Sequence, residues 1–199
     1  QTCALPISDG EVVAMYAGNF GHAQDPRVWL HVAREFTHRP DVRFVFVGSG
    51  ALDSEMRAFV ERFELKNVTF LGQRTPIESA SLLSSSDVQL ISLRASRFFN
   101  LMLPSKVQAA MSSAKPIVAA AEGETARVIQ MSRCGVAHAP DDIEALASSV
   151  ETLVGMSSSE RQAIGQAGRT FYEQHMSSQV GLDALTALAN HVQIGRAHV

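Results

Sequence analysis

The sequence predicts an α/β fold in which a doubly wound, Rossmann-like parallel sheet of about six strands is followed by a helical tail. Short apolar runs alternate with segments of helical periodicity, the pattern of a parallel sheet covered by helices on both faces. Two further helical segments follow the helical segment IEALASSVETLV, with no strand between them. Hydrophobic residues make up 46% of the chain, and no apolar run approaches the roughly 20 residues that span a bilayer. We therefore expect one soluble domain.

The expected strands are short and mostly apolar. They cover residues 12–17, 42–48, 68–71, 88–93, 116–121 and 135–138. The first helix is expected to begin at Asp25-Pro26, a capping residue followed by a proline that suits the first turn. Trp29 lies on the apolar stripe of this helix and is expected in the core rather than under a sugar ring.

Later helices also carry start signals. Thr75-Pro76-Ile77-Glu78 predicts a capping box, and Asp141 or Asp142 is expected to cap the helix that contains IEALASSVETLV. The two final helices are expected over about residues 157–175 and 178–192.

Residues 103–124, LPSKVQAAMSSAKPIVAAAEGE, predict a helix opened by Pro104 and followed by a buried strand. Four residues recur at helical spacing and form the arc expected to face the core: Val107, Ala110, Met111 and Ala114. Lys106 falls in the first turn, where the positive end of the helix dipole disfavours a cation unless an anion lies close by. An anionic ligand at this helix start is the simplest reason for that lysine.

These motifs resemble the nucleotide-sugar-binding half of retaining family-4 glycosyltransferases with the GT-B fold, and they are most similar to bacterial members that build surface polysaccharides. The resemblance is carried by LPSK, Gln108, Ala114-Lys115-Pro116, IVAAA, Gly123-Glu124 and Cys134-Gly135, by YAGNFGHAQDP, FVFVGSG, VTFLG and SDVQLISL upstream, and by APDDIEALASSVETL and ERQAIGQAGRTFYEQHMS downstream. It covers almost the whole chain.

The resemblance implies a hexosyltransferase that moves a sugar, with retention, from a nucleoside diphosphate donor to a polysaccharide or lipid-linked acceptor. UDP is the expected nucleotide, and no metal or other cofactor is implied. The implied donor-binding residues are Gly18, Asn19, Gly21, Gln73, Arg74, Leu103, Pro104, Ser105, Lys106, Gln108, Gly123 and Glu124.

Several of these residues also have an ordinary structural interpretation. The glycine loop at residues 18–22 is also what a tight turn between strand and helix requires. Arg74 also fits an exposed arginine in a solvated turn. Glu124 also fits a carboxylate that complements the dipole at a helix start.

The chain departs from the family pattern at four charged positions. The family's loop after the first strand carries an arginine and, five residues later, a lysine that contact the diphosphate; here these positions are Asn19 and Gln24. The family's paired glutamates, spaced eight apart, are here Asn100 and Gln108. Gln108 still offers an amide to ribose hydroxyls.

The phosphate contact is therefore expected to rest on backbone amides, Lys106 and Arg27. We assign no catalytic residue, because the acceptor side of the resembled enzymes lies in their amino-terminal domain.

The two ends of the chain do not fit the rest. Residues 1–7 can be encoded by DNA whose reverse complement, read in another frame, encodes residues 194–199. We interpret both segments as translated sequencing adapter. The expectation is a donor-binding domain over residues 8–193, with the amino-terminal acceptor domain missing.

Without these ends the composition narrows the functional classes further. Cys134 is then the one cysteine, which excludes a disulfide framework and fits the cytoplasm, with the inner face of the membrane as an option for the full-length protein. Loss of Arg196 changes the net charge from −3 to −4. A protein that binds nucleic acid is expected to carry an excess of positive charge, so this charge argues against that function. The expected partners are a nucleotide sugar and the missing domain, with membrane contact only through missing parts.

Two other functions stay open. A GT-B nucleotide-sugar 2-epimerase shares the architecture, although LPSK and the GNFG loop argue against it. A non-catalytic glycosyltransferase-like binding subunit is made credible by the charges lost at positions 19, 24, 100 and 108.

Overall fold

The computed structural model describes residues 10–196, with side chains to residue 189. Of the two suspected adapter segments, residues 1–7 and 197–199 lie outside the described residues, and residues 194–196 end the last helix.

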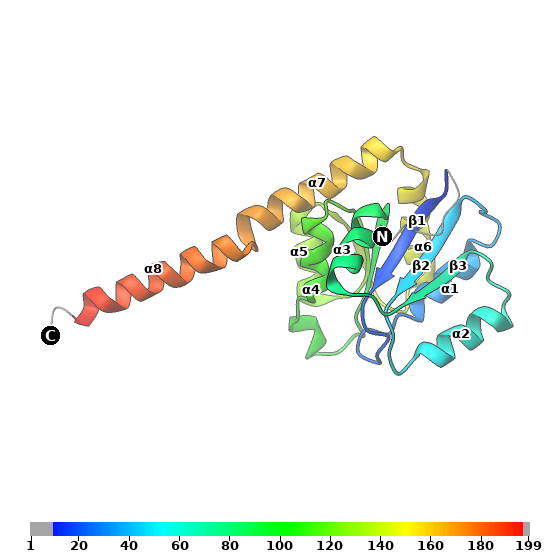
Figure 1. The fold of residues 1–199 in the computed structure, drawn as a ribbon, viewed down its shortest axis with the longest axis horizontal. Helices are drawn as coiled ribbons and strands as arrows, with labels where there is room; N and C mark the ends of the chain where they lie inside the picture. Colours follow the sequence, from blue (N-terminus) through cyan, green and yellow to red (C-terminus); the bar gives the residue numbers. More distant parts are fainter. Residues whose placement is uncertain (1–9, 197–199) are drawn as a thin grey trace.

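The sheet has six parallel strands in the order β3-β2-β1-β4-β5-β6 (Figure 1). They are β1 Val12–Ala17, β2 Val42–Val47, β3 Val68–Gly72, β4 Val88–Ser92, β5 Ile117–Ala120 and β6 Gly135–His138. Each boundary lies within one residue of its expected position. The predicted doubly wound fold is confirmed.

Helices cover both faces of the sheet. One face carries α1 Val28–Glu35, α2 Asp53–Arg62 and α6 Ile143–Gly155. The other carries α3 Pro76–Ser85, α4 Ser105–Ser112 and α5 Gly123–Ser132, with α7 Ser158–His175 packed on α4. A short 3₁₀ helix, η1 Phe99–Leu101, precedes α4.

The strands are apolar on both sides because both sides are covered. Met15 of β1 packs beneath α3, whereas its neighbours Ala14 and Tyr16 point into the larger core beneath α1 and α6. Trp29 is completely buried in that core, which confirms its predicted structural role.

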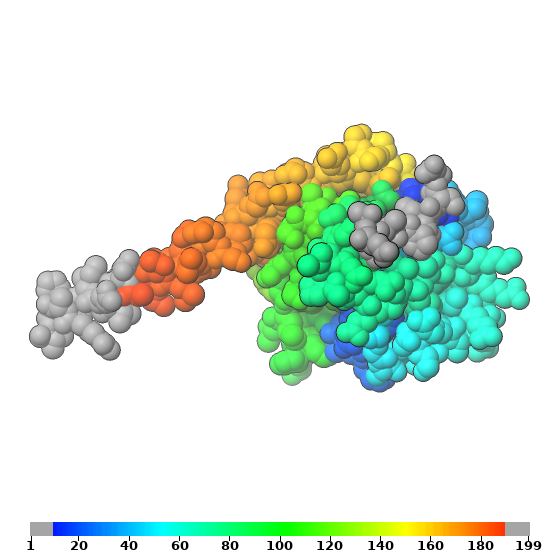
Figure 2. Space-filling view, viewed as in Figure 1, coloured from blue at the N-terminus to red at the C-terminus, as the bar shows by residue number. Residues whose placement is uncertain are grey.

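The last helix, α8 Ser178–Arg196, extends away from the body of the molecule (Figures 1 and 2). Leu182, Leu185 and Leu188 are each more than half exposed along it. The tail is therefore helical, as the sequence predicts.

Two predicted helix starts are confirmed in detail. Thr75 and Glu78 form a reciprocal capping box at α3. Asp142, rather than Asp141, caps α6 by accepting a hydrogen bond from the Ala145 amide at 3.0 Å.

Three other helix predictions are wrong. Helix α1 begins at Val28, not at Asp25-Pro26, because the Asp25 carboxylate accepts two hydrogen bonds from Arg27, at 2.7 and 2.8 Å, and caps nothing. Pro104 is the residue before α4 rather than its first helical residue. Ala114 lies beyond the end of α4, with a left-handed φ of 52°, and is only half-buried.

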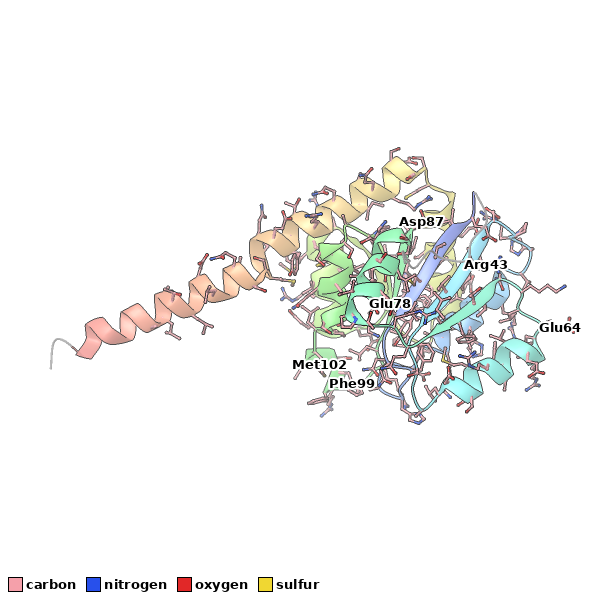
Figure 3. All side chains as sticks on the ribbon, viewed as in Figure 1. Arg43, Glu64, Glu78, Asp87, Phe99 and Met102 are labelled. Carbon is pink, nitrogen blue, oxygen red and sulfur yellow. The ribbon has the colours of Figure 1, made fainter. Side chains whose placement is uncertain are left out.

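An ion pair holds the edge of the sheet at which the strands begin. Arg161 of α7 is 8% exposed and donates to the Asp87 carboxylate at 3.2 Å and to the carbonyl of Met156. The other Asp87 oxygen accepts from the Val13 amide at 2.9 Å. Figure 3 shows Asp87 near the top of the globular body and Phe99 and Met102 near its bottom.

Candidate functional site

Loops that follow β1, β2 and β3 are bonded together at the carboxyl edge of the sheet. The Gly18 amide donates to the Val47 carbonyl at 2.8 Å, and the Gly48 amide donates to the Gly72 carbonyl at 2.9 Å. This edge contains the point between β1 and β4 where the strand order reverses, which is where such sheets bind ligands.

Phe20 anchors the glycine loop. Its side chain is completely buried, with ring centroids 6.0 Å from Tyr16, 6.4 Å from Phe46 and 6.3 Å from Phe70. A loop fixed in this way offers its backbone in one conformation.

Two glycines are required by the close packing of these loops. Gly18 has a φ of 146°, and a Cβ there would lie 2.9 Å from the Nζ atom of Lys106. Gly48 has a φ of 138°, and a Cβ there would lie 1.9 Å from the Gly18 carbonyl oxygen. Any larger residue at position 18 would compete with the lysine for space.

A groove of about 340 Å³ opens beside this loop on the α3 side of the sheet. Its lining includes four predicted site residues: Gly18, Asn19, Gln73 and Arg74. Arg74 is half-buried rather than exposed, and its Nε atom has no hydrogen-bond partner among the described residues. The groove is thus lined by an N–H donor, on Arg74, that has no acceptor among the described residues.

Lys106 reaches from the first turn of α4 across the sheet edge to Tyr16. Its Nζ donates to the Tyr16 hydroxyl at 2.8 Å and lies 4.2 Å from the centroid of the Tyr16 ring. No carboxylate of the described residues lies within 4 Å of it. Burial lowers the pKa of Lys106 to about 8. The result is a half-buried lysine without a carboxylate partner in the part of the chain that the structure describes.

Other predicted residues of this region surround Lys106. Leu103 and Pro104 are half-buried, Ser105 is exposed, and Gln108 is half-buried one turn along α4. The first amides of α4 have no partner within the helix, as at every helix start. Gly21 is buried beside the Asn19 side chain and accepts a backbone bond from Asp25 at 2.9 Å.

Gly123 and Glu124 begin α5 and belong to a separate part of the edge. A Cβ on Gly123 would lie 2.1 Å from the Asn100 carbonyl oxygen, so the two segments touch. Both Glu124 carboxylate oxygens accept from Arg127, at 2.6 and 2.7 Å. Arg127 thus contacts this candidate directly.

Arg27, the other cation expected to contact phosphate, is paired with two carboxylates. It donates to Asp25 and, at 2.7 Å, to Glu55, and these carboxylates raise its pKa. It lines a second cavity of about 540 Å³, in which the acids Asp25, Glu55, Glu122 and Asp141 outnumber the arginines. A wall of that composition disfavours an anion.

Tyr16 and Phe20 are the site components that sequence reasoning missed. In the sequence, Tyr16 is one more residue of the first strand and Phe20 one residue of the glycine loop. Only the fold shows that Tyr16 bonds Lys106 and that Phe20 fixes the loop. The available signal was an aromatic residue on either side of Gly18-Asn19.

Comparison with known proteins identifies the family. The family model described as glycosyl transferases group 1 matches residues 11–155. The chain belongs to the group 1 glycosyl transferases. No curated protein matches it in sequence.

Solved structures of group 1 and related enzymes share the fold of this glycosyl transferase chain. Anabaena HepE, in complex with UDP-glucose, is 19% identical with a TM-score of 0.75; the match covers 90% of this chain and 49% of HepE. Staphylococcus aureus TarM, in a complex that contains UDP, is 17% identical with a TM-score of 0.77, covering 93% of this chain and 36% of TarM.

A third structure is the carboxyl-terminal domain of LpcC, a group 1 glycosyl transferase from Francisella tularensis. It is 18% identical with a TM-score of 0.70, covering 85% of this chain and 88% of that domain. The chain thus spans about half of HepE and most of an isolated carboxyl-terminal domain. The fold is that of the carboxyl-terminal domain of a GT-B glycosyltransferase.

The described part of this glycosyl transferase chain lacks both a metal-binding cluster and a membrane-spanning helix. Residues 10–196 contain no group of three or more histidine, cysteine, aspartate or glutamate side chains suited to a metal ion. No helix in that range combines the length and apolar character of a membrane span.

Proposed function

We propose that this chain is the donor-binding half of a retaining glycosyltransferase, and that the groove beside Gly18 binds a nucleoside diphosphate sugar, with UDP as the nucleotide. The observation that carries the proposal is Lys106, a half-buried lysine that lies beside the glycine loop and, among the described residues, has no carboxylate partner. A diphosphate supplies the missing charge, and the free amides of a helix start favour the same anion.

Each predicted residue then has a place along the ligand. Gln73 and Arg74 hold the nucleoside in the groove, and Gln108 bonds the ribose hydroxyls. Gly18, Asn19, Gly21 and the α4 start from Leu103 to Lys106 enclose the diphosphate. The sugar extends toward Gly123 and Glu124, where it competes with Arg127 for the carboxylate.

In the full-length enzyme this half would stabilise the departing nucleoside diphosphate electrostatically while the sugar passes to its acceptor. We infer a polysaccharide or lipid-linked acceptor, bound mainly by the amino-terminal domain. The solved HepE complexes with UDP, with UDP and glucose, and with UDP-glucose support the choice of UDP nucleotides as first probes.

Calorimetric titration with UDP, GDP, ADP and uridine tests the proposal. We expect UDP to bind, and we expect Lys106→Ala to weaken UDP binding by about 1.5 to 3 kcal/mol, the range for a hydrogen bond to a charged group. Uridine binding should scarcely change, since it lacks the diphosphate.

Lys66→Ala is the matched control, because Lys66 is exposed and lies just before β3, at the edge of the sheet opposite the groove. If Lys106→Ala bound UDP as tightly as the parent, Lys106 would be an ordinary structural residue and the donor-site assignment would fail.

The rival with structural support is a glycosyltransferase-like subunit that binds nucleotide without turnover. Arg27, the nearest replacement for the absent family cations, is held by Asp25 and Glu55. Sugar transfer by a full-length homologue with the same substitutions would exclude this rival; UDP binding without transfer would favour it.

A further inference from the structure

Tyr16 joins two parts of the candidate anion site through one oxygen atom. Its ring is completely buried in the core beneath α1 and α6. Its hydroxyl accepts a hydrogen bond from the Lys106 Nζ at 2.8 Å and donates one to the Asn19 carbonyl at 2.9 Å. The oxygen therefore contacts the lysine and the glycine loop together.

We propose that Tyr16 is the positioning residue of this site: its phenol oxygen holds the Lys106 ammonium and the Asn19 backbone in the arrangement that receives a diphosphate. The inference rests on the proposed function, because it assumes that Lys106 contacts the anion.

A phenol suits this task better than a carboxylate. A carboxylate at the same place would neutralise Lys106 and remove the demand for a ligand anion. The phenol stays neutral, since burial raises the pKa of Tyr16. It occupies one of the three ammonium protons and leaves the others for phosphate oxygens.

The ring and the neighbouring glycine complete the arrangement. The ammonium lies 4.2 Å from the ring centroid, a cation–π contact that offsets part of its lost hydration. Gly18 leaves the space through which Lys106 passes. Apart from Lys106, the Asp25 carboxylate also acts on Tyr16, and that carboxylate is paired with Arg27.

The test is a double-mutant cycle of Tyr16→Phe and Lys106→Met, read by calorimetric titration with UDP and with uridine. Tyr16→Phe removes one oxygen and keeps the buried ring. We expect it to weaken UDP binding about tenfold, the equivalent of one hydrogen bond to a charged group, with uridine binding changed less than about twofold. In the Lys106→Met background the same change should weaken UDP binding less than about twofold, because its target is gone.

Tyr172→Phe is the matched control, since Tyr172 is a partly buried tyrosine that packs on the other core cluster. Thermal unfolding of every variant sets a temperature at which all are folded, so that binding alone is compared.

The outcomes separate this inference from the proposed function. If the parent does not bind UDP, the proposed function fails. If the parent binds UDP and Lys106→Met weakens it while Tyr16→Phe does not, only the positioning role is overturned. A full Tyr16→Phe effect in the Lys106→Met background would also overturn it, because Tyr16 would then act without the lysine.

Discussion

The two ends of the sheet each hold a cation, the buried Arg161 and the half-buried Lys106, and the two differ in what surrounds them. At the amino edge, Arg161 donates to the Asp87 carboxylate and to backbone carbonyls that close α6. At the carboxyl edge, Lys106 meets a neutral phenol. Arg161 has its carboxylate partner within the fold, although its Nε atom has no hydrogen-bond partner among the described residues. Lys106 has no carboxylate within 4 Å among those residues, and under the proposed function a bound anion supplies the missing charge. A cation within the fold thus indicates structure or binding according to its partners.

The largest expected effect tests the amino edge. Arg161→Leu leaves the Asp87 carboxylate without its cation, and we expect it to lower the free energy of unfolding by about 3 kcal/mol. Urea denaturation measures this. UDP binding by the folded variant should equal that of the parent, because the ion pair lies at the far end of the sheet. A stability loss below that of an exposed salt bridge, such as Arg169 with Glu173, would contradict the prediction.

The next effect tests whether the unpaired positive charge of Lys106 lowers the free energy of unfolding. Its folded pKa is about 8, below the ordinary value of 10.5 that the unfolded chain keeps. Below pH 8 both states bind the proton and the cost is fully present; between pH 8 and 10.5 the unfolded state binds more protons, so stability rises with pH.

We therefore expect Lys106→Met to be more stable than the parent at pH 7, by on the order of 2 kcal/mol, with the difference shrinking toward pH 10. Urea denaturation of both proteins at several pH values measures it, and using their difference cancels other titrations. A difference that is constant with pH would show that the ammonium is solvated.

The smallest expected effect tests whether Lys106 depends on the space that Gly18 leaves for its side chain. Gly18→Ala places a Cβ 2.9 Å from the Lys106 Nζ at a φ of 146°. We expect a loss of stability of about 1 kcal/mol from backbone strain, together with weaker UDP binding as the lysine shifts. Gly155→Ala is the control, because a Cβ there meets nothing within 4 Å. Equal behaviour of the two variants would mean that the lysine does not depend on the glycine.

Most of the fold could be predicted from the sequence because both faces of the sheet are buried. A buried parallel strand needs a continuous apolar run, and the six runs mark the six strands to within one residue. Helix starts were harder. Thr75 and Glu78 carry their own reciprocal signal, but Asp25 reads as a cap and instead pairs with Arg27, a choice between two local partners that the sequence does not decide.

A residue of the candidate site could be predicted only where the signal lies in its own stretch of sequence. Lys106 was identified because a cation in the first turn of a helix conflicts with the dipole of that same helix. Tyr16 lies 90 residues away in sequence, and nothing at position 16 indicates that its hydroxyl meets Lys106. The partner becomes visible only when β1 and α4 are brought to one edge.

The groove has two walls that differ in how they are attached to the core, and this matters for redesign. The wall formed by Gly18 and Asn19 is held by Phe20 and Tyr16, so substitutions there would disturb packing well beyond the ligand. The wall formed by Gln73 and Arg74 follows Gly72, around which there is open space. A library that randomises positions 73 and 74 and retains the Thr75–Glu78 cap would vary nucleotide preference on an intact scaffold.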